Sequence, residues 1–290
     1  MKRAYTCLVT TLFLALACAA APLSQEQRAA TVAFAAGLQN DDGGYRPTPA
    51  TADSSLGATT SGLRTIKYFG GEARRKRRTT SFVMSCYHPT LGAFSDKPGG
   101  TPDVRTTAIG LMSLGELQGP IQEHAPAILR YFNENAKSLP DVYIAAAALD
   151  SAKVSNPNAS TWIAMFAPAL STGDESTGKG APELASAAIT TLRLGGTLPN
   201  REHVARVLQA AQKPDGGFGA AETSDLSTTY RLMRAVYMVK AKPDLARLRA
   251  FIDRCRNPDA GYGPTPGQPA TASATYNAGI VLHWIEELQK

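Results

Sequence analysis

The sequence predicts an all-α protein in which about six helix hairpins close into a ring, with an inner and an outer layer of helices. Two observations carry this prediction: a short glycine-containing turn recurs along the chain, and a segment rich in Ala, Thr and Ser follows each turn. The period is roughly 42 residues, which suits a two-helix repeat. With 43% hydrophobic residues, the chain can build a core and is not intrinsically disordered.

The first 21 residues have the pattern of a secretory signal peptide. Lys2 and Arg3 form a basic start, residues 8–16 supply a short apolar stretch, and small residues occupy positions 15–21. We therefore expect an extracytoplasmic protein, periplasmic or secreted, whose single domain comprises residues 22–290. An alternative is a lipoprotein box ending at Cys18, in which case a lipidated Cys18 tethers the protein to a membrane.

The charge of the chain is mildly basic, because the net charge of +6 falls to +4 once Lys2 and Arg3 are removed. The one dense basic run, residues 74–78, lies between two apolar segments. This placement favours a solvated linker or helix start over a polyanion site. No aromatic residues interleave with the run and no nucleic-acid-binding motif accompanies it, so we expect no nucleic acid partner.

Four copies of the turn are clear, at residues 38–45, 86–94, 211–218 and 255–262. Each copy consists of a helix end, a tight turn built from Pro, Asp or Gly, and one aromatic residue. Two degenerate copies, at residues 138–140 and 177–180, complete about six units. The aromatic residues are expected to be packing anchors: Tyr45, Phe94, Phe218 and Tyr262.

In four of the units an acidic residue stands at the start of the helical segment. Steps of 38, 42 and 42 residues separate Asp103, Asp141, Glu183 and Asp225. Carboxylates at helix N-termini accept hydrogen bonds from free amides, so we predict that these acids cap helices around one mouth of the ring. A role at the mouth of a ligand cavity is the alternative, for which Asp225 is the best single candidate.

Each unit contains one amphipathic helix and one helix of small and apolar residues. Residues 202–211 carry apolar side chains at helical spacing on one face, whereas residues 185–194 are almost all small or apolar. The amphipathic helix is predicted to lie outside and the apolar helix inside. Closing the ring removes the exposed ends that an open solenoid, the alternative arrangement, has to cap.

The Gln-x-x-Asp-Gly-Gly-Phe turn before a small-residue helix resembles the α/α toroid of protein prenyltransferase β-subunits and of squalene and terpene cyclases. The resemblance covers residues 24–290 and implies the toroid fold. Members of this superfamily bind an isoprenoid in the central cavity, at the end where the inner helices begin. The turn motif is structural, however, so it does not indicate which chemistry is present.

The catalytic groups that the resemblance would imply are largely missing. Asp225 matches the zinc-binding Asp of protein prenyltransferases, but Ser227 and Ala274 stand where the zinc-binding Cys and His are expected. A hydroxyl and a methyl group cannot replace a thiolate and an imidazole, so we predict neither a metal nor a cofactor. Residues 219–225 contain Glu222 but no diphosphate-binding cation, and the Asp-x-Asp-Asp motif of a cyclase is absent.

The remaining candidate residues indicate little further chemistry. Cys86 and Cys255 are expected to be small buried residues, with a disulfide between them as the alternative. Four histidines lack the spacing of metal ligands: His88, His124, His203 and His283.

These observations favour a binding or interaction module without catalysis, which holds an apolar ligand such as a lipid, an isoprenoid or a peptide segment in the ring. Export supports this hypothesis, because extracytoplasmic space offers no obvious supply of prenyl diphosphate. The alternative is an enzyme of the same superfamily that acts on an isoprenoid substrate, with Asp225 as its weak catalytic candidate.

Overall fold

The computed structural model describes residues 22–219 and 222–290. The expected signal peptide, residues 1–21, and residues 220–221 of the loop before Asp225 lie outside the described residues. The described chain forms six helix hairpins, each with an outer helix followed by an inner helix, and the all-α prediction is confirmed. Across these residues no helix is both long enough and apolar enough to cross a membrane.

The outer helices are α1 (Gln25–Gly37), α3 (Lys76–Ser85), α5 (Ile121–Asn135), α7 (Ala159–Phe166), α9 (Arg201–Ala210) and α11 (Leu245–Arg254), and a 3₁₀ turn, η1 (Ala167–Ser171), extends α7. The inner helices are α2 (Leu56–Tyr68), α4 (Val104–Leu117), α6 (Leu139–Ala152), α8 (Ala181–Arg193), α10 (Leu226–Val239) and α12 (Ala272–Leu288). Two short antiparallel strands, β1 (Tyr87–His88) and β2 (Ala93–Phe94), form the second turn.

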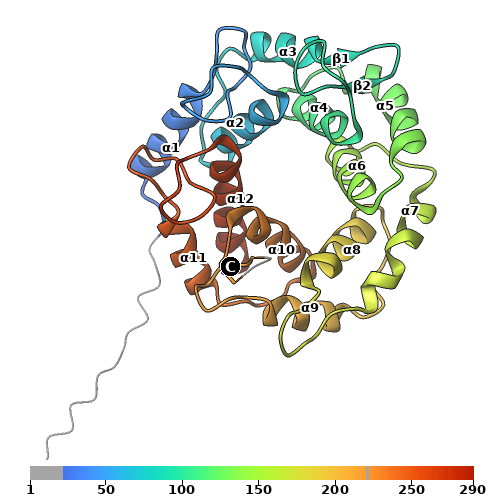
Figure 1. Cartoon of the computed structure of the whole chain (residues 1–290), viewed down its shortest axis with the longest axis vertical. Helices are drawn as coiled ribbons and strands as arrows, with labels where there is room; N and C mark the ends of the chain where they lie inside the picture. Colours follow the sequence, from blue (N-terminus) through green and yellow to red (C-terminus); the bar gives the residue numbers. More distant parts are fainter. Residues whose placement is uncertain (1–21, 220–221) are drawn as a thin grey trace, which may run out of the picture.

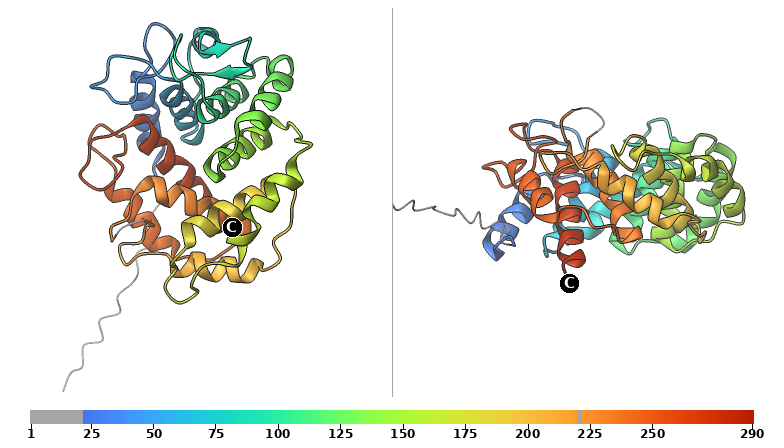
Figure 2. Two further views of the ribbon diagram at one scale, coloured as in Figure 1. Left: turned by 45° about the vertical axis from the view of Figure 1, so that its right-hand side comes forward. Right: turned by 90° about the horizontal axis from the view of Figure 1, so that it is seen from below.

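The ring is closed. Each inner helix packs beside the next, and the last of them, α12, packs against α2, as Figure 1 shows. The predicted closed toroid is therefore confirmed, and the open solenoid is excluded. Seen from the side, the connecting turns gather on one face of the ring and the C-terminus lies on the other (Figure 2).

Side chains at the starts of the inner helices explain why the helices begin there. Asp103 and Asp225 are N-caps, as predicted, and accept hydrogen bonds from the amides of Thr106 and Thr228. The prediction needs correction for Asp141, which is the third residue of α6, behind the N-cap Ser138. Its carboxylate closes a capping box by accepting a bond from the Ser138 amide, 3.3 Å away.

Glu183 also differs from the prediction. Helix α8 begins after Gly180, which has no side chain to cap with, and Glu183 is the third residue of the helix. Its carboxylate lies in the first turn, where a negative charge complements the partial positive charge of the helix N-terminus.

The four clear turns share one hydrogen bond. In each turn the backbone amide of the aromatic residue donates a hydrogen bond, 3.0 Å long, to a threonine hydroxyl four residues past the N-cap of the following inner helix. The pairs are Tyr45 with Thr59, Phe94 with Thr107, Phe218 with Thr229, and Tyr262 with Thr275. All four aromatic side chains are buried, which confirms them as packing anchors.

Neighbouring units are joined at the same face of the ring. The first amide of an inner helix donates to a carbonyl in the turn of the next unit, from Leu56 to Asp96 and from Leu226 to Pro264. The first amide of α12, that of Ala272, donates to the Pro47 carbonyl over 2.8 Å and so links the last unit to the first. Backbone hydrogen bonds therefore help to close the ring.

The core lies between the two layers of helices and contains both cysteines of the described chain. Cys86 and Cys255 are buried free thiols, as expected, and form no disulfide. Burial raises the pKa of Cys86 to about 11 and that of Cys255 to about 12, so both thiols are protonated at neutral pH. The basic run at residues 74–78 is exposed at the start of α3, as predicted for a solvated helix start.

Candidate functional site

A cavity of about 290 Å³ lies in the middle of the ring. All six inner helices contribute side chains to its wall. The lining residues are Arg64, Lys67, Tyr68, Met112, Glu116, Tyr143, Ile144, Ala147, Asp150, Ser151, Arg193, Tyr230, Arg234 and Tyr276.

The lining residues occupy equivalent positions in the different repeats. Arg64, Met112, Ala147 and Arg234 each lie nine residues past the N-cap of their helix. Glu116, Asp150 and Arg193 lie twelve or thirteen residues past it, one turn deeper along the helix. The cavity is therefore lined mainly by the middle and final turns of the inner helices.

The wall of the cavity is charged and aromatic. Arg64, Lys67, Arg193 and Arg234 face two carboxylates, those of Glu116 and Asp150, so cations exceed acids by two. Four tyrosine side chains complete much of the remaining wall. The expectation of a small-residue, apolar interior is wrong at these positions, because the small side chains of the inner helices face mostly toward neighbouring helices.

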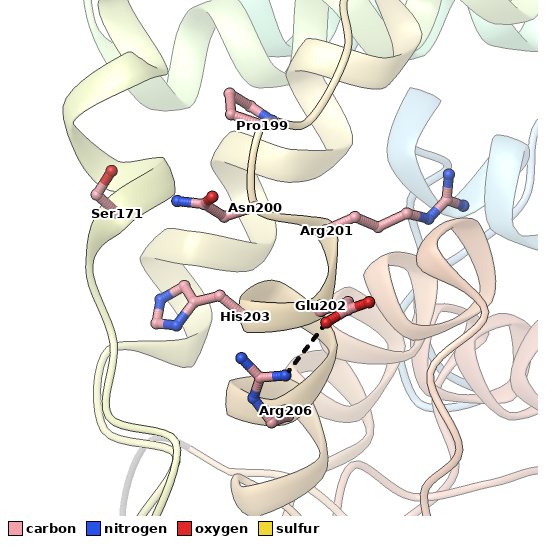
Figure 3. A pocket seen from close by; sticks show the side chains of 7 residues that line it. All are labelled: Ser171, Pro199, Asn200, Arg201, Glu202, His203 and Arg206. Carbon is pink, nitrogen blue, oxygen red and sulfur yellow. Dashed lines mark ion pairs between the residues drawn. The ribbon is translucent and has the colours of Figure 1, made fainter.

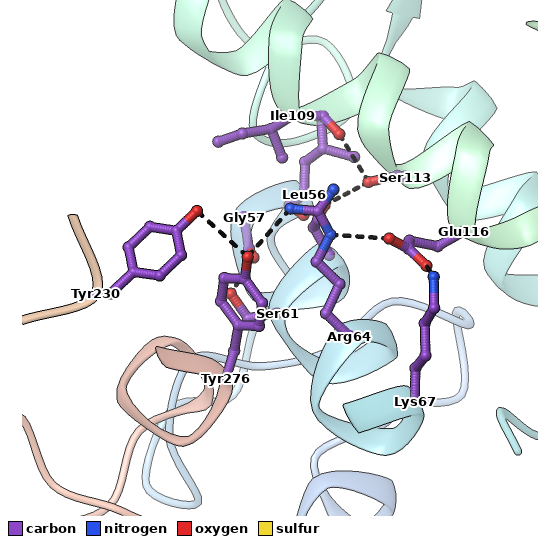
Figure 4. Close-up of polar contacts among 11 residues, drawn as sticks. Leu56, Gly57, Ser61, Arg64, Lys67, Ile109, Ser113, Glu116, Tyr230 and Tyr276 are labelled. Carbon is purple, nitrogen blue, oxygen red and sulfur yellow. Dashed lines mark hydrogen bonds and ion pairs between the residues drawn. The ribbon is translucent and has the colours of Figure 1, made fainter. Parts of the chain in front are cut away.

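A chain of polar contacts crosses the ring from α4 through α2 and α12 to α10 (Figure 4). Both carboxylate oxygens of Glu116 accept hydrogen bonds, from Arg64 Nε at 3.0 Å and from Lys67 Nζ at 2.9 Å. The Arg64 guanidinium also donates to the Tyr276 hydroxyl at 3.4 Å, and that hydroxyl donates to the Tyr230 hydroxyl at 3.4 Å. Glu116 is thus engaged as a hydrogen-bond acceptor between two cations.

The two linked tyrosines differ strongly in acidity. Burial disfavours the charged form of Tyr230, but Arg234 and Arg193, with further help from Tyr276 and Arg64, outweigh it and lower the pKa of its phenol to about 7. Burial and the neighbouring Tyr230 raise the pKa of Tyr276. Among the four tyrosines of the wall, Tyr230 is therefore the one whose phenol can ionise near neutral pH.

Arg234 has no carboxylate partner among the described residues. Its guanidinium lies over the ring of Trp284, 4.4 Å from the centroid, and over the ring of Tyr230 at 5.7 Å. Its Nε atom is buried without a hydrogen-bond partner. The aromatic faces hold the position of this cation but leave part of its donor capacity unused.

The positive charge of Arg193 is only weakly compensated by the nearest carboxylate. Its Nε lies 3.8 Å from a carboxylate oxygen of Asp150, which is beyond hydrogen-bonding distance. Asp150 also pairs with Lys153 at 3.3 Å. Burial and repulsion from Arg234 lower the pKa of Arg193, which indicates an excess of positive charge at this point of the wall.

The acidity of Tyr230 gives a direct spectroscopic prediction. We expect the absorbance at about 295 nm to show one tyrosine ionising near pH 7, and the step to be missing in Tyr230→Phe. Because the folded pKa lies below the unfolded value of about 10, ionisation of Tyr230 adds stability as pH rises from 7 to 10, and this part is lost as pH falls through 7. Tyr262→Phe is the control, since burial raises the pKa of that phenol to about 12. A step near pH 7 that persists in Tyr230→Phe would assign the ionisation to another group.

The acids and family-motif positions singled out in the sequence lie elsewhere. Asp103, Asp141, Glu183 and Asp225 ring the end of the toroid where the inner helices begin, and none of them lines the cavity. Asp225 is occupied as an N-cap. Beside it Ser227 is exposed, whereas Ala274 is buried.

The histidines have separate structural contacts. His88 bonds to Ser95, His203 bonds to Glu175, and the rings of His124 and His283 pack on tyrosines. In the described part of the chain, no three His, Cys, Asp or Glu side chains gather as a metal site would need.

A second hollow of about 550 Å³ opens on the outer surface beside η1 and the start of α9 (Figure 3). Its polar groups are already paired with other parts of the chain. Arg201 donates to the carbonyls of Met238 and Val239, while His203 and Arg206 both bind the Glu175 carboxylate. These contacts tie α9 to its surroundings, so the hollow is a weaker candidate than the central cavity.

Comparison with protein families agrees with this architecture. The family model described as the prenyltransferase alpha-alpha toroid domain matches residues 3–115, 56–133 and 181–290. The chain belongs to this family. No curated protein matches the chain in a sequence search.

Solved structures similar to this toroid include the apo form of the type II terpene cyclase MstE from Scytonema, with a TM-score of 0.60, 13% identity, and coverage of 92% of this chain and 99% of that one. A variant of MstE in complex with merosterolic acid A, its product, has a TM-score of 0.62 and 13% identity, covering 91% and 96%. A protein from Actinoplanes has a TM-score of 0.61 and 15% identity, covering 92% and 100%. At these identities the likeness shows the fold alone.

The sequence did not reveal the cavity residues of this toroid, because its recognisable signals lie at the starts of the inner helices. The available signal was the register of the repeat. Counting nine and then twelve or thirteen residues from each N-cap selects side chains on one face of each helix, since these offsets differ by about one helical turn. That count picks out Arg64, Arg193 and Arg234, three arginines inside helices that are otherwise rich in small residues.

Proposed function

We propose that this toroid is a non-catalytic binding protein that acts outside the cytoplasm and holds a small ligand in its central cavity. The observation that carries the proposal is the wall of the cavity, in which side chains from all six inner helices, among them four tyrosines and three arginines, surround one volume. Ligand sites combine such apolar surfaces with a few convergent polar groups. The first 21 residues, with their signal-peptide pattern, support the extracytoplasmic location.

The size of the cavity supports a small molecule. A volume of about 290 Å³ is at the lower limit of cavities that take drug-sized ligands. A peptide segment or a long isoprenoid chain would need more room than the described side chains leave. The lack of a free acid supports binding rather than proton-initiated catalysis, because Glu116 and Asp150 are both paired with cations.

The second candidate function is an enzyme that acts on an isoprenoid-like substrate. The similarity to terpene cyclases of the same fold and the four tyrosine rings of the wall favour it. The excess of two positive charges speaks against cyclisation, because a carbocationic intermediate would be repelled by Arg193 and Arg234. Binding is therefore the function that the cavity supports better.

Native mass spectrometry of the protein purified without denaturation tests the proposal. We expect the wild type to retain a small molecule and Ala147→Phe to lose it, because a phenyl group at position 147 fills part of the cavity. Ala29→Phe, the same change on the exposed face of α1, is the matched control and should keep the ligand. Equal occupancy in Ala147→Phe and the wild type would place the ligand outside the cavity. Turnover of an added isoprenoid would favour the enzyme.

A further inference from the structure

The enclosed charges of the cavity do not balance. Lys67 extends to solvent, with 62% of its side chain exposed, so water screens its charge. The Arg64 and Arg193 side chains are only 12% and 10% exposed. Glu116 is the one well-buried carboxylate of the wall, because the Asp150 side chain is 41% exposed, so the positive charge of Arg193 and Arg234 is not fully compensated while the Tyr230 phenol is protonated.

The arginines of the wall differ in whether a carboxylate lies beside them. Glu116 lies against Arg64 at hydrogen-bonding distance, so this pair is complete. Asp150 lies nearer to Lys153 than to Arg193, and Arg234 has no acid beside it. The shortage of negative charge thus falls on Arg193 and Arg234, on the neighbouring helices α8 and α10.

We propose that Arg193 and Arg234 bind the carboxylate group of a small monoanionic ligand in the central cavity. This inference rests on the proposed function, since it names the ligand class of the same site. A carboxylate matches the planar donor fork of a guanidinium, and its negative charge would offset the positive charge left at Arg193 and Arg234. The aromatic faces of Tyr143, Tyr230 and Tyr276 line the rest of the wall and suit a flat or apolar body attached to that carboxylate.

The arrangement also explains why Arg234 stands over aromatic rings rather than beside an acid. Contacts with Trp284 and Tyr230 hold the guanidinium by its face, and no carboxylate of the described chain lies at its N–H edge. A carboxylate of the protein at the same place would occupy that edge.

Titration calorimetry with formate, acetate and benzoate tests this proposal, and benzamide serves as the neutral isostere of benzoate. Work at about pH 6 keeps the Tyr230 phenol protonated, so that its own negative charge does not compete. We expect at least one carboxylate to bind the wild type and benzamide to bind at least tenfold more weakly than benzoate. Arg234→Gln and Arg193→Gln should each weaken carboxylate binding about tenfold or more, because each removes charged hydrogen bonds.

Two controls keep the result interpretable. Arg130→Gln, which removes the same charge from the exposed surface of α5, should bind like the wild type. Two variants are used because Arg193 retains a distant acid and Arg234 has none, so a folding defect in one leaves the other informative. Inorganic phosphate is the competing oxyanion, and tighter binding of phosphate than of every carboxylate would overturn the assignment of ligand class.

Failure of this inference differs from failure of the proposed function. If none of the three carboxylates binds, or if benzamide binds as well as benzoate, the carboxylate site is wrong. The binding function would still stand if native mass spectrometry found a neutral molecule that Ala147→Phe excludes. If Ala147→Phe keeps its ligand while benzoate binds through Arg234, the proposed location of the natural ligand is wrong but the anion site is supported.

Discussion

Replacing Gly216 with alanine is expected to lower the free energy of unfolding by about 4 kcal/mol, because the change combines backbone strain with a clash. Gly216 has a φ of +95°, a conformation that residues with side chains rarely adopt. A β-carbon there would lie 2.1 Å from the carbonyl oxygen of Arg247 in α11. The carbonyl belongs to a helix backbone, so it cannot move aside unless α11 shifts from its place in the ring.

Urea unfolding followed by circular dichroism measures this effect, and Gly267→Ala is the matched control. Gly267 has a φ of +80°, but nothing lies within 4 Å of its β-carbon position. Its substitution carries the strain without the clash and should cost about 1 kcal/mol. Gly43, in the equivalent turn of the first repeat, faces the Arg78 carbonyl in the same way, so Gly43→Ala should resemble Gly216→Ala. Equal losses for Gly216→Ala and Gly267→Ala would contradict the packing role of the turn.

Replacing Glu116 with glutamine is expected to cost about 3 kcal/mol, because it leaves the enclosed Arg64 guanidinium without an anionic partner. The two side chains are only 14% and 12% exposed, so water cannot fully replace the lost partner. The variant also raises the excess of positive charge beside Arg193 and Arg234. Thermal and urea unfolding at neutral pH should both show the loss.

A surface pair is the control for this prediction. Glu287 pairs with Lys290 at the exposed end of α12, and Glu287→Gln should leave the free energy of unfolding unchanged within experimental error. The double variant Arg64→Met with Glu116→Met should recover most of the loss, because two apolar side chains need no charge compensation. If Glu116→Gln were as stable as Glu287→Gln, the Arg64–Glu116 pair would contribute nothing to the stability of the fold.

The repeat was predictable from sequence because each unit carries its own local signals. The aromatic residue of each clear turn and the capping residue that follows it are set within a short stretch of chain. Phe218, for example, bonds to Thr229 only 11 residues away. Asp141 and Glu183 were misplaced as caps because a residue in the first helical turn and a true N-cap have the same composition signal. The carbonyls of Pro47 and Pro264 join neighbouring units, and no local signal in the sequence indicates this role.

The central cavity was not predictable to the same degree. Arg193 and Arg234 are separated by 41 residues and meet only because the ring brings α8 and α10 together. An isolated arginine in an apolar helix is indistinguishable from one at an exposed helix end. Only the placement of the helices determines that its side chain points to the centre rather than to solvent.

The sequence by itself determined the all-helical fold, the two-helix repeat and the starts of most inner helices. These properties depend on local periodicity, capping and residue identity. The tertiary structure alone decided that the interior of the ring is cationic and aromatic rather than apolar. The physical reason is that charge compensation is a property of neighbours in space. Whether Arg234 has an acid beside it depends on helices far away in the chain.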